Sequence, residues 1–124
     1  MKYKPLWLNS AMQAAICVAI ADCVQNSHGD LTIVAAAMET THMHLLIPYS
    51  GRDIDGTAKW LADRTTKEVH QRTEHKTPVW CKGKWRSFMY EYEHWFNAIE
   101  YIEQHNVRRG RERRPYPFIC NTPV

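Results

Sequence analysis

LTIVAAAMETTHMHLLI, residues 31–47, consists of two short apolar runs separated by the polar triplet ETT. The first run ends at Met38 and the second begins at His42, and Pro48 then stops it because proline lacks the amide hydrogen that a strand ladder uses. Short apolar runs bounded by polar residues are typical of buried strands. We therefore expect two adjacent strands, paired antiparallel.

Three helices are expected around this strand pair. The first begins at a cap on Ser10, runs to about Gln25 and stops at Asn26 and Gly29. Its apolar run, residues 11–24, is shorter than the roughly 20 residues that cross a bilayer. We therefore expect a buried helix here and no membrane partner.

The second and third helices are predicted from apolar stripes at helical spacing. The second is capped by Asp53 or Asp55 and turns Lys59 to water, and the third runs from about Glu93 to Val107. The stripes comprise Ile54, Ala58, Leu61, Ala62, Thr65 and Val69 in the second helix and Trp95, Ala98, Ile99 and Ile102 in the third.

Two further segments complete the expected organisation. Residues 84–90 have the aromatic, alternating character of a strand. Beyond Gly110 the proline-punctuated sequence is expected to pack only locally, as part of a basic tail at about residues 108–124. A chain of 124 residues suffices for one core and is too short for two ordinary domains, so residues 1–124 are expected to form a single domain.

Charge and cysteine content indicate the type of binding partner and the cellular location. Residues 1–58 carry three Lys and Arg against five Asp and Glu, whereas residues 59–124 carry thirteen against eight. The second half is therefore where a polyanion would bind. The four cysteines include no CxxC pair, so we expect reduced thiols and a cytoplasmic location.

His42 and His44 are two residues apart, so on a strand both rings project from the same face and can bind one metal ion. Alone, such a pair is more often two surface histidines. Tyr101 and His105 are four apart and share one face of the third helix. They flank its apolar stripe, where residues can reach an adjacent strand and stay open to substrate. The alternative without a functional role is that Tyr101 is an amphipathic residue at the rim of the helix and His105 is a cation at the C-terminal end of the helix.

Phosphoryl transfer would use this set of side chains. A tyrosine hydroxyl, with an ordinary pKa of about 10, is a weak nucleophile at neutral pH. A divalent metal ion that polarises the phosphate offsets that weakness.

The segment THMHLLI resembles the HUH motif, two histidines around a bulky hydrophobic residue, of the single-tyrosine transposases. PVWCKGKWRSF and AIEYIEQHNVRRG are similar to the tryptophan-rich strand and tyrosine helix of the REP-associated tyrosine transposase branch. With the intervening helix KWLADRTTKEVHQR, the resemblance covers roughly residues 31–118.

The resemblance implies an α+β fold, a ferredoxin-like antiparallel sheet with helices packed on one face. It also implies His42 and His44 as ligands of Mg²⁺ or Mn²⁺, and Tyr101 as the nucleophile that forms a 5′-phosphotyrosine. The implied partner is single-stranded or hairpin DNA, and the protein is a monomer or a homodimer. His105 stands where the family commonly has Asn or Gln, and imidazole suits Mn²⁺ or Zn²⁺ better than Mg²⁺.

Two departures from the family accompany the resemblance. Only Met1 to Leu8 precede Ser10, so we expect that the usual N-terminal strand is very short or missing, or that the start is truncated. The Asn-Pro-Val that follows the tyrosine turn in the family reads His105, Asn106 and Val107 here.

Basic and aromatic side chains in the second half are candidates for DNA contacts, because backbone attraction and base stacking both favour them. Each has a plain alternative as a solvated or core residue. The candidates are Lys59, Lys82, Lys84, Trp85, Arg86, Arg108 and Arg109.

Two other functions remain open. One is a catalytically idle DNA-binding protein that keeps the fold and the basic surface. The other is a small zinc hydrolase that uses His42, His44 and His105, for which Tyr101 would be incidental. A covalent adduct between protein and DNA separates both from a nicking enzyme.

Overall fold

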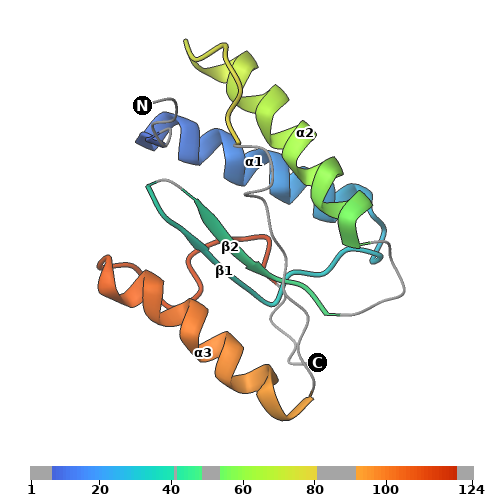
Figure 1. Cartoon of the computed structure of the whole chain (residues 1–124), viewed down its shortest axis with the longest axis vertical. Coiled ribbons are helices and arrows are strands. Elements are labelled where there is room, and N and C mark those ends of the chain that lie inside the picture. Colours follow the sequence, from blue (N-terminus) through green and yellow to red (C-terminus); the bar gives the residue numbers. More distant parts are fainter. Residues whose placement is uncertain (1–6, 41, 49–53, 81–91, 120–124) are drawn as a thin grey trace, which may run out of the picture.

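The computed structural model describes residues 7–40, 42–48, 54–80 and 92–119. Two antiparallel strands and three helices give the expected α+β layout (Figure 1). The elements are α1 (Ser10–Asn26), β1 (Ala35–Met38), β2 (Met43–Leu46), α2 (Ile54–Arg72) and α3 (Tyr92–Arg108). The strand expected at residues 84–90 lies outside the described residues.

The strands form a hairpin in which Ala37 pairs with His44 and Met38 pairs with Met43. The Glu39 amide donates to the His42 carbonyl at 2.8 Å and closes the turn. The predicted antiparallel pair is therefore confirmed. β1 is shorter than the apolar run, because Ile33, two residues before it, forms a parallel bridge to Ile119 instead.

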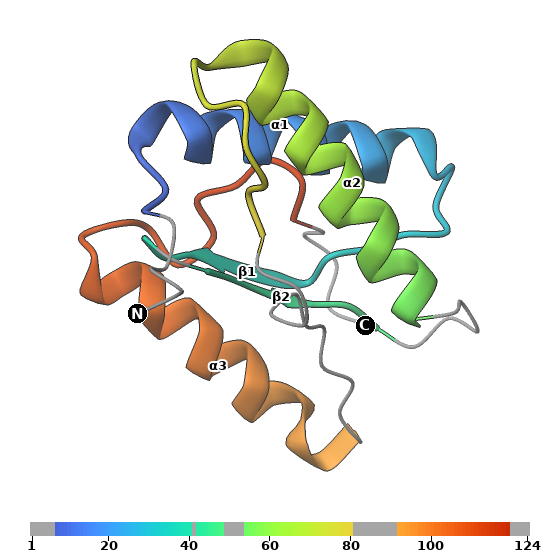
Figure 2. The same ribbon diagram turned by 45° about the horizontal axis from the view of Figure 1, so that its top comes forward.

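The helices are distributed over both faces of the hairpin. Ala36 and Met38 pack with α1 in the larger apolar cluster, whereas Ala35 and Ala37 pack with α3 in the smaller one. Side chains alternate between the faces of a strand, and alanines let a helix approach closely on either side. α1 and α2 thus cover one face, and α3 covers the other rather than the same one (Figure 2).

α1 is capped one residue earlier than expected. The Asn9 side-chain oxygen accepts a hydrogen bond from the Met12 amide at 2.9 Å, and Ser10 is the first helical residue. Asparagine caps as well as serine does, because either side chain satisfies a free amide of the first turn. The helix ends at Asn26 as predicted, and the chain leaves through Gly29 at φ 93°, a conformation that suits glycine.

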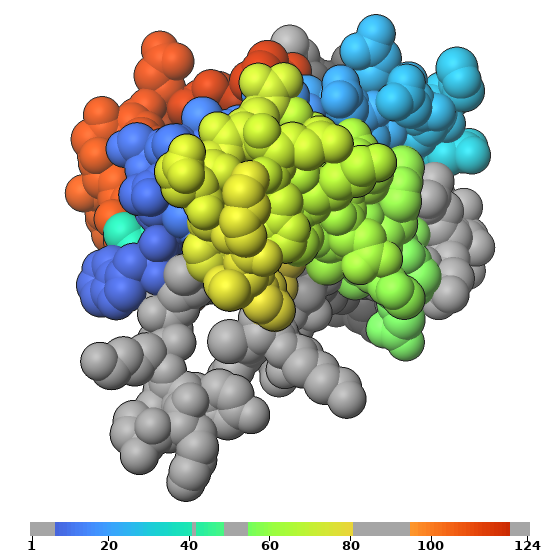
Figure 3. Space-filling view, turned by 90° about the horizontal axis from the view of Figure 1, so that it is seen from above, coloured from blue at the N-terminus to red at the C-terminus, as the bar shows by residue number. Residues whose placement is uncertain are grey.

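α2 packs along α1, and the two helices form one side of the molecule (Figure 3). Leu61, Thr65 and Val69 of the predicted stripe are fully buried, and Lys59 is exposed as predicted. The buried Thr65 hydroxyl donates to the Leu61 carbonyl at 2.7 Å and accepts from the Trp80 indole at 2.8 Å. Among the described residues, no helix is long and apolar enough to span a membrane.

The segment after α3 does not pack locally, and that expectation was wrong. Phe118 and Ile119 are buried in the same apolar cluster as α1, and the Tyr116 hydroxyl accepts a hydrogen bond from the Met38 amide at 2.9 Å. The segment therefore runs along the outer edge of β1. Its prolines and arginines indicated a loop, but an apolar pair near its end anchors it to the core.

Candidate active site between strand β2 and helix α3

His42 and His44 lie on one side of the hairpin, as their spacing predicted. His44 is on β2 on the same face as Leu46, which packs against α3. His42 immediately precedes β2, and the centroids of the two imidazoles are 4.9 Å apart with the rings nearly perpendicular. The alternation of the strand thus turns both rings toward the α3 face.

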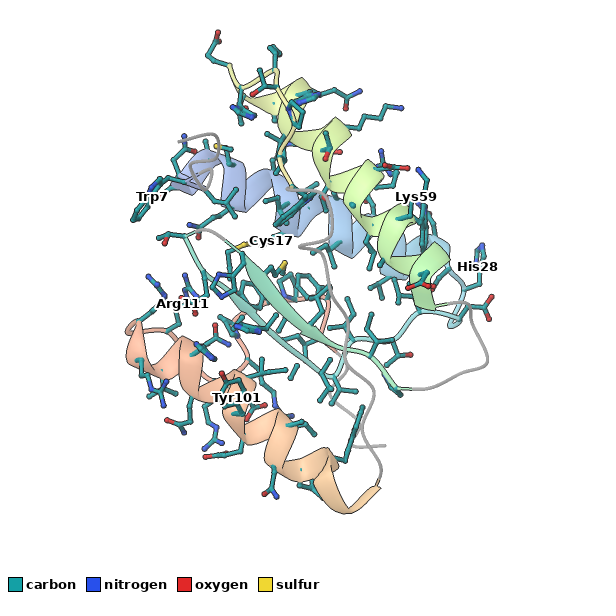
Figure 4. The ribbon with its side chains drawn as sticks, viewed as in Figure 1. Trp7, Cys17, His28, Lys59, Tyr101 and Arg111 are labelled. Carbon is teal, nitrogen blue, oxygen red and sulfur yellow. The ribbon has the colours of Figure 1, made fainter. Side chains whose placement is uncertain are left out.

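Helix α3 brings Tyr101 and His105 to the same place. Their ring centroids are 5.0 Å apart, as expected for residues one turn apart on a helix. The His44 ring stacks on His105 at 4.7 Å and lies 6.2 Å from Tyr101. His42, His44, Tyr101 and His105 therefore form one group, here called the histidine–tyrosine cluster, in which Tyr101 is 59% exposed (Figure 4) and His42 is also exposed.

Comparison with known proteins gives no family for the chain. No protein-family model matches it, and no significant match is found among the curated proteins or the solved structures.

Glu39 is a member of the site that the sequence reasoning missed. It follows β1 directly, is 7% exposed, and places Oε2 3.1 Å from Nδ1 of His105. Arg109 holds the other oxygen of the same carboxylate, with Nη2 at 2.6 Å and Nε at 2.7 Å. A glutamate between two strands reads as an ordinary turn residue, and the only signal was its place at the end of a buried strand, three residues before His42.

The electrostatics keep Glu39 charged. Burial raises the pKa of its carboxyl, but the hydrogen bond and charge of Arg109, with His105 and His42, outweigh burial and lower the pKa overall. The carboxylate therefore remains an acceptor at neutral pH.

His44 is held in the neutral form. Burial lowers the pKa of its imidazole, and the nearby His105 and His42 lower it further, against the smaller opposing effect of Glu39. A neutral imidazole keeps a lone pair that can bind a metal ion or accept a proton.

The imidazole nitrogens of the cluster are suitable ligands for a divalent metal ion. His105 Nε2 is buried without a hydrogen-bond partner, so its lone pair is a candidate to bind a metal ion. Among the described residues, no three His, Cys, Asp or Glu side chains converge as a preformed metal site. The rings of His44 and His105 stack face to face, so their nitrogens do not point at a common centre.

A cavity of about 420 Å³ adjoins the cluster and is lined by Glu39, His105, Arg108 and Arg109. Arg109 is engaged with Glu39, whereas no described residue is found as a side-chain partner of Arg108. Of the two arginines, Arg108 is therefore the one available to a phosphate.

The remaining basic candidates divide into two groups. Lys59 lies on α2, across the hairpin from Tyr101, and pairs with Asp63 at 3.0 Å (Figure 4). The structure thus does not bring Lys59 to the cluster. Lys82, Lys84, Trp85 and Arg86 lie outside the described residues.

The arginines after α3 bind the protein itself. Arg111 donates to the Met38 carbonyl at 2.8 Å. Arg113 and Arg114 both pair with Glu103, which is 3% exposed, at 3.1 and 2.7 Å. These arginines therefore stabilise the packing of the segment against the rest of the protein, and they do not form a free basic tail.

Proposed function

We propose that the chain is a metal-dependent enzyme that nicks and rejoins single-stranded or hairpin DNA, with Tyr101 as its nucleophile. One observation carries the proposal. Tyr101 is exposed, and its ring lies against His44 and His105, which come from a strand and a helix far apart in the sequence. An accessible tyrosine beside several imidazoles suits attack on a phosphodiester, because an adjacent base or a metal ion held by those imidazoles can activate the hydroxyl.

The reaction begins when the Tyr101 oxygen attacks phosphorus in line with the bond to the 3′ oxygen. The phenolic proton passes to solvent as the new O–P bond forms. The P–O3′ bond breaks, the departing 3′ oxygen takes up a proton, and a 5′-phosphotyrosine remains. Attack by another 3′ hydroxyl reverses these steps and joins the strands.

The cluster histidines are the residues that would hold the metal ion. His42, His44 and His105 would supply imidazole nitrogens once the stacked rings of His44 and His105 turn toward a common ion. The lowered pKa of His44 keeps its imidazole neutral. A bound Mg²⁺ or Mn²⁺ neutralises charge on the phosphate and orients it. Three imidazole donors favour Mn²⁺ over Mg²⁺, because Mg²⁺ prefers oxygen ligands.

Arg108 supports the assignment of a polyanionic substrate. It lies three residues after His105 in the last turn of α3 and lines the cavity beside His105. A strand whose scissile phosphate lies at Tyr101 can place a neighbouring phosphate near this guanidinium. The DNA contacts of Lys82, Lys84, Trp85 and Arg86 stay predictions from the sequence.

The test is a search for the covalent adduct. Protein incubated with labelled single-stranded DNA from its genomic flanks and Mn²⁺ should give a labelled band that survives denaturing electrophoresis. Metal-dependent cleavage without an adduct would instead indicate a hydrolase that uses a water nucleophile. DNA binding with neither cleavage nor adduct would indicate an idle DNA-binding protein.

A further inference from the structure

We propose that Glu39 is a positioning residue for His105, an inference that rests on the proposed function. Its carboxylate accepts a hydrogen bond from the Nδ1–H group of the imidazole, which leaves Nε2 unprotonated and able to bind a metal ion. Arg109 holds the carboxylate of Glu39 in position for this contact with His105.

The distances support this arrangement. Glu39 Oε2 lies 3.1 Å from His105 Nδ1, within hydrogen-bond range, yet that oxygen and His105 Nε2 are both buried without a well-aligned hydrogen bond. The torsion that turns an imidazole is broad, so a small rotation aligns the N–H with the oxygen. One rotation then satisfies Oε2 and leaves Nε2 of His105 as a buried nitrogen without a hydrogen-bond partner among the described residues.

The contacts of Glu39 leave one of its two carboxylate oxygens to His105. Arg109 contributes two short contacts to the other oxygen of Glu39, so the carboxylate is already paired with a full positive charge. The remaining oxygen, Oε2, faces Nδ1 of His105, whose ring stacks on that of His44. Glu39 therefore accepts a hydrogen bond from the Nδ1–H group, and it selects which nitrogen is protonated.

A metal-binding histidine commonly donates a hydrogen bond from its other ring N–H to a carboxylate, and this contact sets the tautomer and strengthens the ligand. The chain offers a matched comparison in Glu103. This second buried glutamate is also paired with arginines, Arg113 and Arg114, but no histidine contact is found for it among the described residues. Loss of a buried carboxylate as such can therefore be separated from loss of this contact.

The first experiment reads the tautomer by long-range ¹H–¹⁵N NMR of uniformly labelled protein at pH 8, without metal or DNA. The His105 signals are assigned from their absence in His105→Asn. We expect the proton on Nδ1 in the wild type, opposite to the preference of free histidine. Glu39→Gln keeps an acceptor oxygen and should retain this tautomer, whereas Glu39→Leu should move the proton to Nε2. Glu103→Gln should leave it unchanged.

The second experiment measures Mn²⁺ affinity by calorimetry. Glu39→Leu should weaken binding by roughly 10- to 100-fold, the usual effect of losing a carboxylate behind a ligating histidine. Glu39→Gln should recover part of that loss, and Glu103→Gln should bind as the wild type does.

A wild-type His105 that carries its proton on Nε2, or on both nitrogens, would overturn the proposal. So would unchanged tautomer and affinity in Glu39→Leu. If Glu39→Leu does not fold, the wild-type and Glu39→Gln spectra still decide. Because the spectra need neither DNA nor turnover, an absent DNA adduct would reject the proposed function without touching this result.

Discussion

The two faces of the β1–β2 hairpin carry different chemistry. The face beneath α1 and α2 is closed by an apolar cluster whose central members, such as Ile16 and Ile20, are fully buried. The face beneath α3 has a smaller cluster around Trp95 and Ile102, and at its rim the polar histidine–tyrosine cluster begins. The face beneath α1 and α2 contributes mainly to stability. The face beneath α3 buries a smaller apolar cluster and carries polar groups at the surface.

The difference shows how a short strand serves both purposes. Ala36 and Ala37 are both fully buried, yet they face opposite layers of the molecule. Their small side chains let helices approach from both sides, so one hairpin supports a core and a site together. Substitutions on the two faces should therefore change different properties.

The largest expected effect is that of Tyr101→Phe on the α3 face. Adduct formation should fall below detection, because only the attacking oxygen is removed. DNA binding and the free energy of unfolding should stay nearly unchanged, because the Tyr101 ring is largely exposed. Denaturing electrophoresis and urea titration measure the two properties.

Tyr116→Phe is the matched control for that substitution. It removes the hydroxyl bonded to the Met38 amide and should cost about 0.5–1.5 kcal/mol of stability with the adduct retained. A persistent adduct in Tyr101→Phe would show that another residue is the nucleophile.

Ile20→Ala on the opposite face should show the reverse pattern. Ile20 is fully buried, and truncation of such a side chain typically costs about 2–5 kcal/mol. The molecules that remain folded should form the adduct at the normal rate. Val18→Ala, exposed on the same helix, should stay within about 0.5 kcal/mol of the wild type. Loss of adduct in folded Ile20→Ala would show that the two faces are coupled.

His105→Asn should change metal preference rather than abolish binding. An amide oxygen is a harder donor than an imidazole nitrogen, so the ratio of Mn²⁺ to Mg²⁺ affinity should fall by a few-fold. Gln104→Asn, one residue away on α3, is the control and should leave the ratio unaltered. Equal ratios in His105→Asn and the wild type would make His105 a helix-end residue outside the site.

Acidification should expose a smaller difference, through His44. Its pKa is lowered in the folded protein by burial and by His105 and His42, so the unfolded chain takes up the proton first as the pH falls. The free energy of unfolding should therefore decline below about pH 6.5, the ordinary pKa of histidine, and recover above it.

Two variants isolate this effect. His44→Asn should flatten the decline in the free energy of unfolding. Urea titrations between about pH 5 and pH 8, the range in which histidine titrates, measure this decline. His28→Asn is the control, since His28 is exposed and its positive φ of 53° is one that asparagine tolerates. An unchanged slope in His44→Asn would assign the acid sensitivity to other groups.

Local patterns in the sequence were enough to predict much of this arrangement. The stripe from Trp95 to Ile102 predicted a helix at 93–107, and α3 spans Tyr92–Arg108. The spacing of His42 and His44 predicted their common face, because alternation along a strand is a local rule. The four-residue spacing of the helix pair likewise predicted the contact of Tyr101 with His105.

The features that were missed all depend on contacts between distant residues. Glu39 meets His105 and Arg109 only after α3 has packed on β1, and nothing near Glu39 in the sequence indicates that. Asn106 is fully buried and donates to the Ala36 carbonyl at 2.8 Å, although its neighbours on α3 suggest an ordinary helix end. Sequence periodicity reports which face of an element is apolar, but it does not report which polar residues meet across the fold.

The way the outer edge of β1 is covered has a consequence for biosynthesis. The Ala36 and Met38 carbonyls and the Met38 amide bond to Asn106, Arg111 and Tyr116, all of which are translated long after the strand. A nascent chain on the ribosome therefore carries an open strand edge until the segment through residue 119 has emerged. Such an edge readily pairs with other chains. Translation that stalls before Asn106 would leave a product that aggregates, even though both strands and two helices have already been made.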